Sequence, residues 1–141
     1  MREINEITGQ VVDAAYRLHS RLGPGLLESA YRLALTADLQ RRGLKVEQEK
    51  PISFQYEGMV IENAFRIDLL VEERVVVELK SLEKLAPVHA KQVLTYLNIL
   101  DLPIGLLITF GAARMNDGMH RILNDRASTA HECIVPRRVH G

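Results

Sequence analysis

The sequence predicts an α/β domain in which a mixed sheet is flanked by helices, and three observations predict this fold class. Two aliphatic, β-branched segments, residues 65–71 and 75–80, are separated by the polar residues 72–74, which is typical of an antiparallel hairpin. A helical pattern from Pro87 to about Leu100 then leads to another apolar strand, residues 104–110. A strand, a helix and a further strand indicate a right-handed crossover between parallel strands, so the sheet is expected to be mixed.

Two helices are expected before the strands. Apolar residues at helical spacing predict an amphipathic helix over about residues 4–21, and the Gly-Pro-Gly segment 23–25 ends it. A second helix is expected over residues 26–42, because a glycine follows it. Glu28 and Tyr31 share a face of this helix. The structural alternative for Glu28 is a first-turn carboxylate that the helix dipole stabilises. The structural alternative for Tyr31 is a core aromatic residue, and we expect Tyr31 to be structural.

The chain between the second helix and the hairpin is expected to add a strand. Residues 44–56 are extended and partly alternating, and Glu57 and Gly58 form a turn into a long strand that begins near Val60. These strands and the hairpin complete a three-stranded meander. After strand 104–110, we expect residues 111–118 to form a loop before a short last helix.

The length of the hairpin turn decides which residues face one another. If residues 72–74 form the loop, Asp68 lies opposite Glu78. In the same register Arg66 lies opposite Lys80, and these four side chains share one face. The other face then carries only apolar side chains: Phe65, Ile67, Leu69, Val71, Val75, Val77 and Leu79. A shorter loop would place Asp68 on that apolar face, where an unpaired carboxylate is costly, so the pattern favours this register.

The facing carboxylates are suited to metal-dependent hydrolysis. Opposed carboxylates have Cβ atoms about 5 Å apart, which is close enough to hold one hard divalent cation. Lys80, on the same face as Glu78, could orient or deprotonate an attacking water and stabilise charge that grows on a phosphate. The structural alternative is a strand end in solvent, where Lys80 and a carboxylate form a surface ion pair. Taken alone, so short a pattern favours that alternative.

The expected crossover helix carries polar and aromatic residues at helical spacing. His89, Gln92 and Tyr96 form one stripe, apart from the apolar residues of the helix. An amide such as that of Gln92 can hold a water or a phosphate oxygen without competing for protons. The alternative is a solvated helix face with an amphipathic tyrosine, and for His89 that alternative is favoured.

Together these segments resemble a known family. The matching residues are Gly25, Glu28 and Tyr31 on one helix, Arg66 and Asp68 on one strand, Glu78 and Lys80 on the next, and Gln92 on the following helix. From about residue 5 to residue 124 the sequence resembles the GxxExxY proteins, a branch of the PD-(D/E)XK nuclease superfamily. The resemblance implies a restriction-endonuclease-like fold with an αβββαβ core.

The resemblance also implies roles for the matching residues. Asp68 and Glu78 would bind magnesium or manganese, and Lys80 would act on the water. Glu28 would be an auxiliary acidic residue, and Gln92 would support the site. Further auxiliary candidates are Arg66, Tyr31, His89 and Tyr96. The proline of the superfamily motif is replaced by Ile67, so strand context alone places the aspartate.

The expected function is metal-dependent hydrolysis of phosphodiester bonds in DNA or RNA. The superfamily also includes members that only bind or scaffold, so membership does not by itself establish catalysis. The alternative is a catalytically silent module with the same fold that binds nucleic acid or a protein partner. A homodimer that shares an apolar helix face is a further expectation.

Charge and composition limit the class of protein. The chain has 18 Lys and Arg against 18 Asp and Glu, so its overall field does not attract nucleic acid. A local basic rim is still expected from Arg41, Arg42, Arg66, Lys80, Lys84 and Lys91. No long apolar run and no basic-then-apolar signal is present, which predicts a soluble, cytoplasmic protein without membrane contact.

The length predicts one domain over residues 1–126, followed by a tail over residues 127–141. Cys133 is the only cysteine, so an internal disulfide cannot form. Its polar neighbours lack the further ligands that a zinc site requires, and we expect this cysteine to be incidental.

Overall fold

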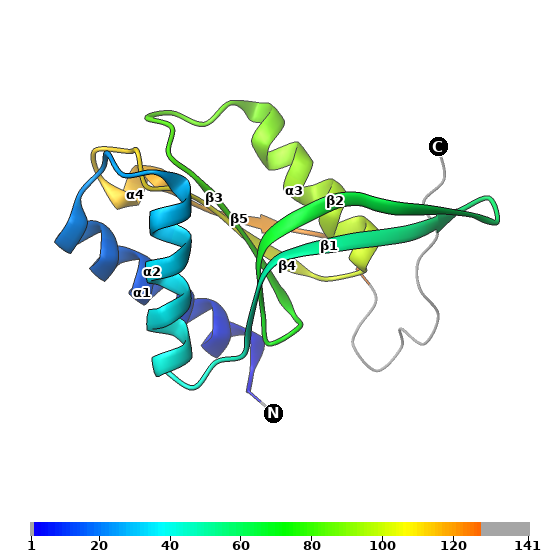
Figure 1. Cartoon of the computed structure of the whole chain (residues 1–141), viewed down its shortest axis with the longest axis horizontal. Coiled ribbons are helices and arrows are strands. Elements are labelled where there is room, and N and C mark those ends of the chain that lie inside the picture. Colours follow the sequence, from blue (N-terminus) through cyan, green and yellow to red (C-terminus); the bar gives the residue numbers. More distant parts are fainter. Residues whose placement is uncertain (1, 128–141) are drawn as a thin grey trace.

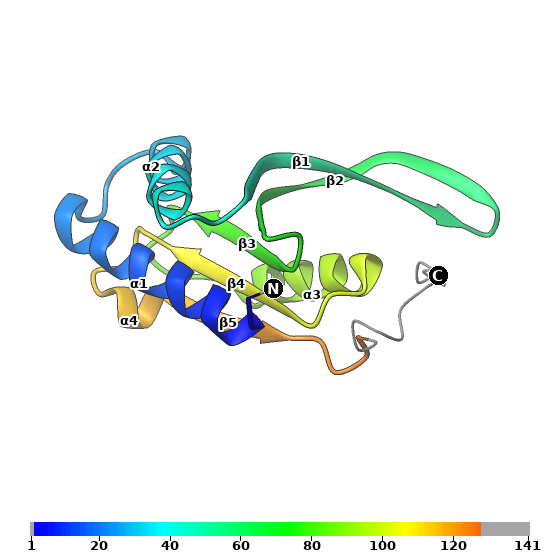
Figure 2. The same cartoon turned by 90° about the horizontal axis from the view of Figure 1, so that it is seen from below.

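The structure is a computed structural model that describes residues 2–127, and it contains a five-stranded sheet with helices on both faces (Figure 1, Figure 2). Its elements are α1 (Ile4–Leu22), α2 (Glu28–Arg41), β1 (Val46–Tyr56), β2 (Met59–Val71), β3 (Val75–Lys80), α3 (Pro87–Leu100), β4 (Ile104–Thr109), α4 (Met115–Gly118) and β5 (Met119–Leu123). Apart from Ala127, the predicted tail with Cys133 lies outside the described residues. No helix within residues 2–127 has both the length and the apolar composition needed to cross a membrane.

The sheet is mixed, as the sequence predicts. Its strands follow the order β1-β2-β3-β4-β5, in which β3 and β4 are parallel and the other neighbours are antiparallel. Helix α3 makes the crossover between the parallel pair and has the predicted bounds. The αβββαβ order of a restriction-endonuclease-like core is therefore confirmed.

The last described segment differs from the prediction of a loop and a short last helix. Helix α4 is a single turn, and β5 follows directly and pairs antiparallel with β4. This edge strand has no fully buried residue, and Leu123 is 61% exposed. A strand without a buried face lacks the apolar alternation by which strands are identified in a sequence, so the prediction is wrong at this point.

Helices α1 and α2 cover one face of the sheet, and α3 covers the other (Figure 1). The cluster beneath α1 and α2 includes Ile7, Val11, Leu35, Val77 and Leu79. The smaller cluster beneath α3 includes Ile52, Ile67, Val76, Val93 and Leu97. Burial of these apolar side chains provides the main driving force for folding.

Strands β1 and β2 continue beyond the rest of the sheet as a two-stranded arm (Figure 1, Figure 2). Strand β2 pairs with β3 only from Leu69 to Val71, whereas it pairs with β1 as far as Met59. The body of the protein therefore supports only the last part of β2, and the arm projects from the sheet at about Asp68.

The faces of β2 also differ from the prediction. Phe65 and Ile67 were expected on the same face as Leu69, but they pack beneath α3, whereas Leu69 packs beneath α1 and α2. The alternation breaks at Asp68. Across β1 the corresponding residue is Glu49, whose φ of 47° is left-handed rather than extended. The exchange of faces on β2 thus lies opposite a left-handed residue of β1.

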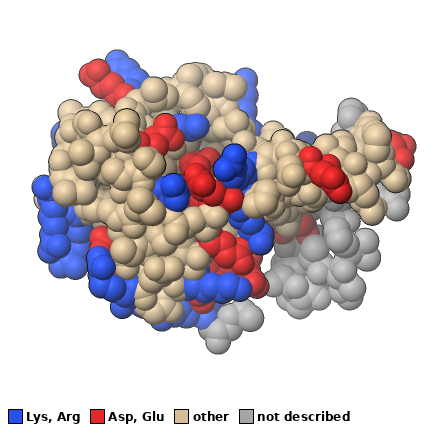
Figure 3. All heavy atoms as spheres, viewed as in Figure 1, with Lys and Arg blue, Asp and Glu red and all other residues tan. Residues whose placement is uncertain are grey.

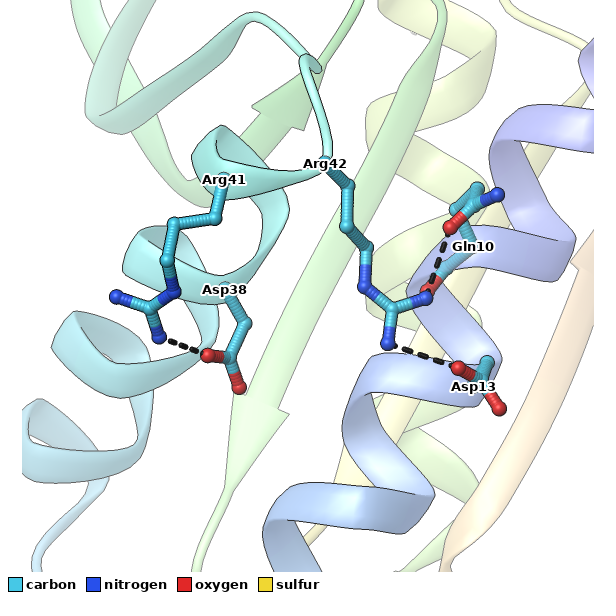
Figure 4. Close-up of polar contacts among 5 residues, drawn as sticks. All are labelled: Gln10, Asp13, Asp38, Arg41 and Arg42. Carbon is cyan, nitrogen blue, oxygen red and sulfur yellow. Dashed lines mark hydrogen bonds and ion pairs between the residues drawn. The ribbon is translucent and has the colours of Figure 1, made fainter.

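Polar contacts hold the carboxyl end of α2 to α1 (Figure 4). Arg42 reaches across to α1, where it donates to the Gln10 side chain and pairs with Asp13, both at 2.8 Å. Arg41 stays along α2 and pairs with Asp38. The contacts of Arg42 therefore link the carboxyl end of α2 to α1, whereas the Arg41 pair lies within α2.

A close main-chain approach at Gly111 predicts a loss of stability on substitution. A Cβ atom there would lie 2.5 Å from the carbonyl oxygen of Ser81 and 2.6 Å from that of Leu82. Because main-chain atoms must move, we expect Gly111→Ala to lower the free energy of unfolding by about 1–3 kcal/mol. Denaturant unfolding followed by circular dichroism measures this change.

Gly9 of α1 provides the matched control for this substitution. A Cβ atom at Gly9 meets no other atom within 4 Å, and alanine is the better helix former. Gly9→Ala is therefore expected to stabilise the protein by about 0.5–1 kcal/mol. A Gly111→Ala protein as stable as the wild type would contradict the close packing after β3.

Candidate active site

The candidate site lies where main-chain pairing between β2 and β3 ends. The pairing of Val71 with Val75 confirms the predicted register. One position beyond the last main-chain pair, the N–H of Asp68 donates to Oε1 of Glu78 at 3.1 Å. The N–H of Leu79 donates to Oδ2 of Asp68 at 2.8 Å. The two acidic residues thus face each other, and their side chains bridge the strands where the main chains no longer pair.

Burial makes Glu78 a weaker acid than an ordinary glutamate. Glu78 is only 4% exposed, and Asp68 is half-buried. Burial, together with repulsion from Asp68 and a side-chain hydrogen bond with it, raises the pKa of Glu78 to about 9. The positive charge of Lys80 acts in the opposite direction and lowers that pKa less strongly. The pair therefore retains a proton at neutral pH when no cation is bound.

Lys80 ends β3 beside the carboxyl pair. Its ammonium group forms no ion pair with any side chain in the described part of the chain. Since Glu78 is also buried, the alternative of a solvated strand end with a surface ion pair is wrong. The predicted position of Arg66 opposite Lys80 is wrong as well. Arg66 pairs with Pro51 of β1, because β2 leaves β3 at Asp68.

Helix α3 brings Tyr96 and Gln92 to the pair. The ring of Tyr96 stacks on Phe65, with centroids 4.1 Å apart and planes 2° apart. Burial and then the charges of Glu78 and Asp68 raise the pKa of Tyr96, whereas a hydrogen bond with the Gln92 side chain lowers it. The tyrosine hydroxyl therefore lies within electrostatic reach of both carboxyl groups.

His89, the remaining member of the predicted stripe, caps the start of α3. Its Nδ1 accepts a hydrogen bond from the main-chain N–H of Ala86 at 2.9 Å. A side chain in the first turn that binds the N–H of the capping residue stabilises the start of a helix. This contact therefore agrees with a structural role for His89 at the start of the helix.

The G-x-x-E-x-x-Y segment places the start of α2 next to the end of β3. Tyr31 is buried, and its hydroxyl donates to the carbonyl of Gly23 and accepts from the N–H of Leu26 at 3.2 Å. Ser81, which follows β3, donates to the carbonyl of Leu26 at 3.3 Å. Tyr31 is thus structural, as expected. Glu28 lies exposed on the first turn of α2 at the same edge of the sheet.

Glu28 does not complete a metal cluster with the carboxyl pair. Within residues 2–127, no group of three or more His, Cys, Asp or Glu side chains is placed to hold one metal ion. The expectation of a third acid near the metal is therefore not met in this arrangement. Asp68 and Glu78 are the two acidic groups that the fold brings together here.

The residues predicted to form one basic rim lie in separate places. Arg41 and Arg42 belong to the end of α2 that contacts α1 (Figure 4). Glu28 begins that helix, so about 20 Å of helix axis separates them from the site edge, and including them in the rim was wrong. Lys84 and Lys91 are exposed on the segments that follow β3.

Two residues near the site were not predicted from the sequence. Glu49 of β1 lies 3.4 Å from Arg32 of α2 and 3.6 Å from Arg66 of β2. Their contacts join three elements, so no spacing in the sequence identifies them. Figure 3 shows basic and acidic side chains gathered around a hollow near the base of the arm.

The raised pKa of Glu78 predicts how stability depends on pH in the absence of divalent metal. The folded protein holds this proton up to about pH 9, whereas an unfolded glutamate loses it near pH 4.5. The free energy of unfolding should therefore fall as the pH rises between these values, by up to ~1.4 kcal/mol per pH unit. Glu78→Gln removes the titration and should flatten the dependence. Thermal unfolding in EDTA across this range compares the two proteins, and equal slopes would contradict the assignment.

Comparison with known proteins agrees with this fold. The family model of the PD-(D/E)XK nuclease superfamily matches residues 5–122. Comparisons with curated proteins and with solved structures gave no significant match. The matched segment extends from α1 to β5 and contains the carboxyl pair. This chain belongs to the PD-(D/E)XK nuclease superfamily.

Proposed function

We propose that the protein is a divalent-metal-dependent nuclease of the GxxExxY type that hydrolyses phosphodiester bonds in DNA or RNA. Membership of the superfamily suggests nuclease activity. The observation that carries the proposal is the facing pair Asp68 and Glu78, with Lys80 at the end of the same strand. The finer family assignment is supported by residues 25–31, whose tyrosine holds the loop before α2 next to the site.

The carboxyl pair fits a hard divalent cation. Each carboxyl uses one oxygen to accept a main-chain hydrogen bond and keeps a second oxygen for another partner. The raised pKa of Glu78 reflects negative charge that this buried position tolerates only with a proton or a cation. Mg²⁺ is usually held by one or two carboxylates and keeps several waters, so a pair suffices. Nucleases of this superfamily generally use divalent metals, commonly Mg²⁺, and Mn²⁺ prefers the same oxygen ligands.

The side chains around the pair suit hydrolysis. A metal held by Asp68 and Glu78 would supply Lewis-acid polarisation of a phosphate. The ammonium of Lys80, which forms no ion pair within the described residues, can orient a water and stabilise charge on the phosphate. Deprotonation of the water by this side chain would require its neutral amine. The water oxygen bonds to phosphorus, one P–O ester bond breaks, and the departing oxygen takes up a proton. Gln92 and Glu28 lie at the edge, where they can bind water.

The charge balance favours a second candidate function, a catalytically silent module that binds nucleic acid or a protein partner. Equal numbers of basic and acidic residues give no general attraction to a polyanion. A domain of this size also offers little surface for reading bases. If the protein cuts, we therefore expect cutting that depends on nucleic-acid structure or on a partner.

Metal binding separates the two functions. We expect Mg²⁺ or Mn²⁺ to bind with a dissociation constant of about 1 mM or lower, and we expect Glu78→Gln to abolish binding. Isothermal titration calorimetry measures both. Glu47→Gln is the matched control. Glu47 of β1 pairs with Lys45 and Lys50, and its substitution should leave the affinity unchanged. Binding that survives Glu78→Gln would place the metal elsewhere.

Cleavage assays test the reaction itself. Labelled single- and double-stranded DNA and RNA are incubated with Mg²⁺ or Mn²⁺ and with wild type or Lys80→Ala from parallel preparations. We expect wild type to cut at least one substrate and Lys80→Ala to lose about 100-fold or more in rate. Lys45→Ala, which removes an exposed lysine paired with Glu73 at the opposite end of β3, should keep the activity.

The remaining outcomes also have distinct meanings. Equal cutting by wild type and Lys80→Ala would identify a contaminating nuclease. Metal binding without any cutting would favour the silent module or an enzyme that requires a partner. Loss of cutting in Lys45→Ala as well would contradict the specific role given to Lys80.

A further inference from the structure

Glu49 is held between two arginines that come from different elements. Its Oε1 lies 3.4 Å from Nη2 of Arg32 in α2, and its Oε2 lies 3.6 Å from Nη1 of Arg66 in β2. Arg32 is oriented by a further contact, since its Nη1 donates to Oε1 of Gln48 at 2.6 Å. Each oxygen of a single carboxylate therefore faces a separate guanidinium group.

This cluster lies next to the carboxyl pair. By strand register Glu49 lies across from Asp68, and Arg66 is two residues from Asp68 along β2. A cavity of about 480 Å³ opens here, lined by Glu49, Pro51, Asn63, Phe65 and Arg66. Phe65, which lines the cavity, stacks on Tyr96. The charges of Glu78 and Asp68 contribute to the raised pKa of Tyr96, so this wall of the cavity lies close to the carboxyl pair. The cavity is large enough for a phosphate and its neighbouring sugar.

The backbone of Glu49 is in an unusual conformation. Its φ of 47° lies in the left-handed region, which is costly for a residue that carries a Cβ atom. Such residues persist only where the surrounding structure maintains them, and they cluster at sites that bind ligands. The conformation interrupts the regular alternation of β1 at the position where the carboxylate meets both arginines.

The two ion pairs are weak enough for another anion to replace the carboxylate. The side chains of Glu49 and Arg66 are 49% and 64% exposed, whereas that of Arg32 is only 18% exposed. Both distances exceed the spacing of a strong charged hydrogen bond. An exposed pair such as Glu49 and Arg66 contributes little to stability and is screened by salt. A phosphate offers more oxygens and more charge than a carboxylate, and the planar donors of guanidinium groups match it well.

We propose that Arg32 and Arg66 form a binding subsite for a backbone phosphate of a nucleic-acid strand, and that Glu49 occupies the subsite until the strand displaces it. The identification of the strand as nucleic acid rests on the proposed function. On binding, the carboxylate turns out to solvent and the phosphate takes its place between the guanidinium groups. A strand held there runs along the base of the arm and past the carboxyl pair.

Binding measured without cleavage tests the subsite. A short fluorescein-labelled single-stranded oligonucleotide, as DNA and as RNA, is titrated with protein in EDTA, and fluorescence anisotropy gives the dissociation constant. Glu49→Gln keeps the size of the side chain but removes the competing charge, and it should tighten binding by about threefold to tenfold. Arg32→Ala should weaken binding by about tenfold, and Glu49→Gln should give no gain in the Arg32→Ala background.

Two matched controls separate the subsite from general charge effects. Glu47→Gln removes a carboxylate from the same strand, but this one pairs with Lys45 and Lys50 rather than with an arginine. Arg41→Ala removes an arginine of α2 that pairs with Asp38. Each control should change the dissociation constant by less than about twofold at physiological salt.

A gain in Glu49→Gln that Glu47→Gln does not reproduce would support the subsite. An equal gain in both variants, or no gain in Glu49→Gln, would overturn it and leave Glu49 as a structural link between α2 and the arm. Thermal unfolding checks that each variant is folded. If Arg32→Ala does not fold, Arg32→Lys replaces it in the binding assay. This assay contains no divalent metal and measures no cleavage. Binding as expected, in a protein that never cleaves nucleic acid, would therefore support the subsite and contradict the proposed function.

Discussion

Main-chain pairing between β2 and β3 stops just before Asp68 and Glu78, and the two acidic side chains take over as acceptors. Without them, the N–H groups of Asp68 and Leu79 would lose their partners, at a cost of about 1–3 kcal/mol for each donor in a protein interior. The carboxyl groups are therefore part of the hydrogen bonding of the sheet. They are also close and shielded from solvent, so a proton or a cation must balance their charge. This requirement connects the fold to its chemistry.

Both helical layers support that position through aromatic contacts. On one face Tyr31 stacks on Phe110, whose N–H donates to the carbonyl of Lys80 at 2.9 Å. On the other face Tyr96 stacks on Phe65 beside the pair. The end of β3 is thus held from two sides, which limits how far the lysine can move from the carboxyl groups. The tyrosine of the G-x-x-E-x-x-Y segment acts through packing, which explains why a residue so far from the carboxyl strands belongs to the same pattern.

The sequence was informative where a local rule determines the structure. The polar turn 72–74 and the segregation of charges predicted the register that brings Asp68 to Glu78, and Pro87 marked the start of the crossover helix. Strand β5 carried no such signal, because an edge strand without a buried face need not alternate. The exchange of faces at Asp68 lies opposite a left-handed glutamate on another strand, and this conformation is usually associated with glycine or asparagine.

The balanced charge of the chain does not record where its charges lie. Arg41 and Arg42 are matched by carboxylates on the helices, at the end of α2 away from the site. At the base of the arm, by contrast, the carboxylate of Glu49 is exposed and lies more than 3 Å from both of its arginines. The carboxylate of Glu49 neutralises the two arginines only while it lies between them. Once it turns away, an incoming phosphate would meet two guanidinium groups rather than a neutral surface. In the proposed subsite, such an internal competitor would make the attraction for a phosphate depend on displacing one side chain at the edge where the carboxyl pair lies.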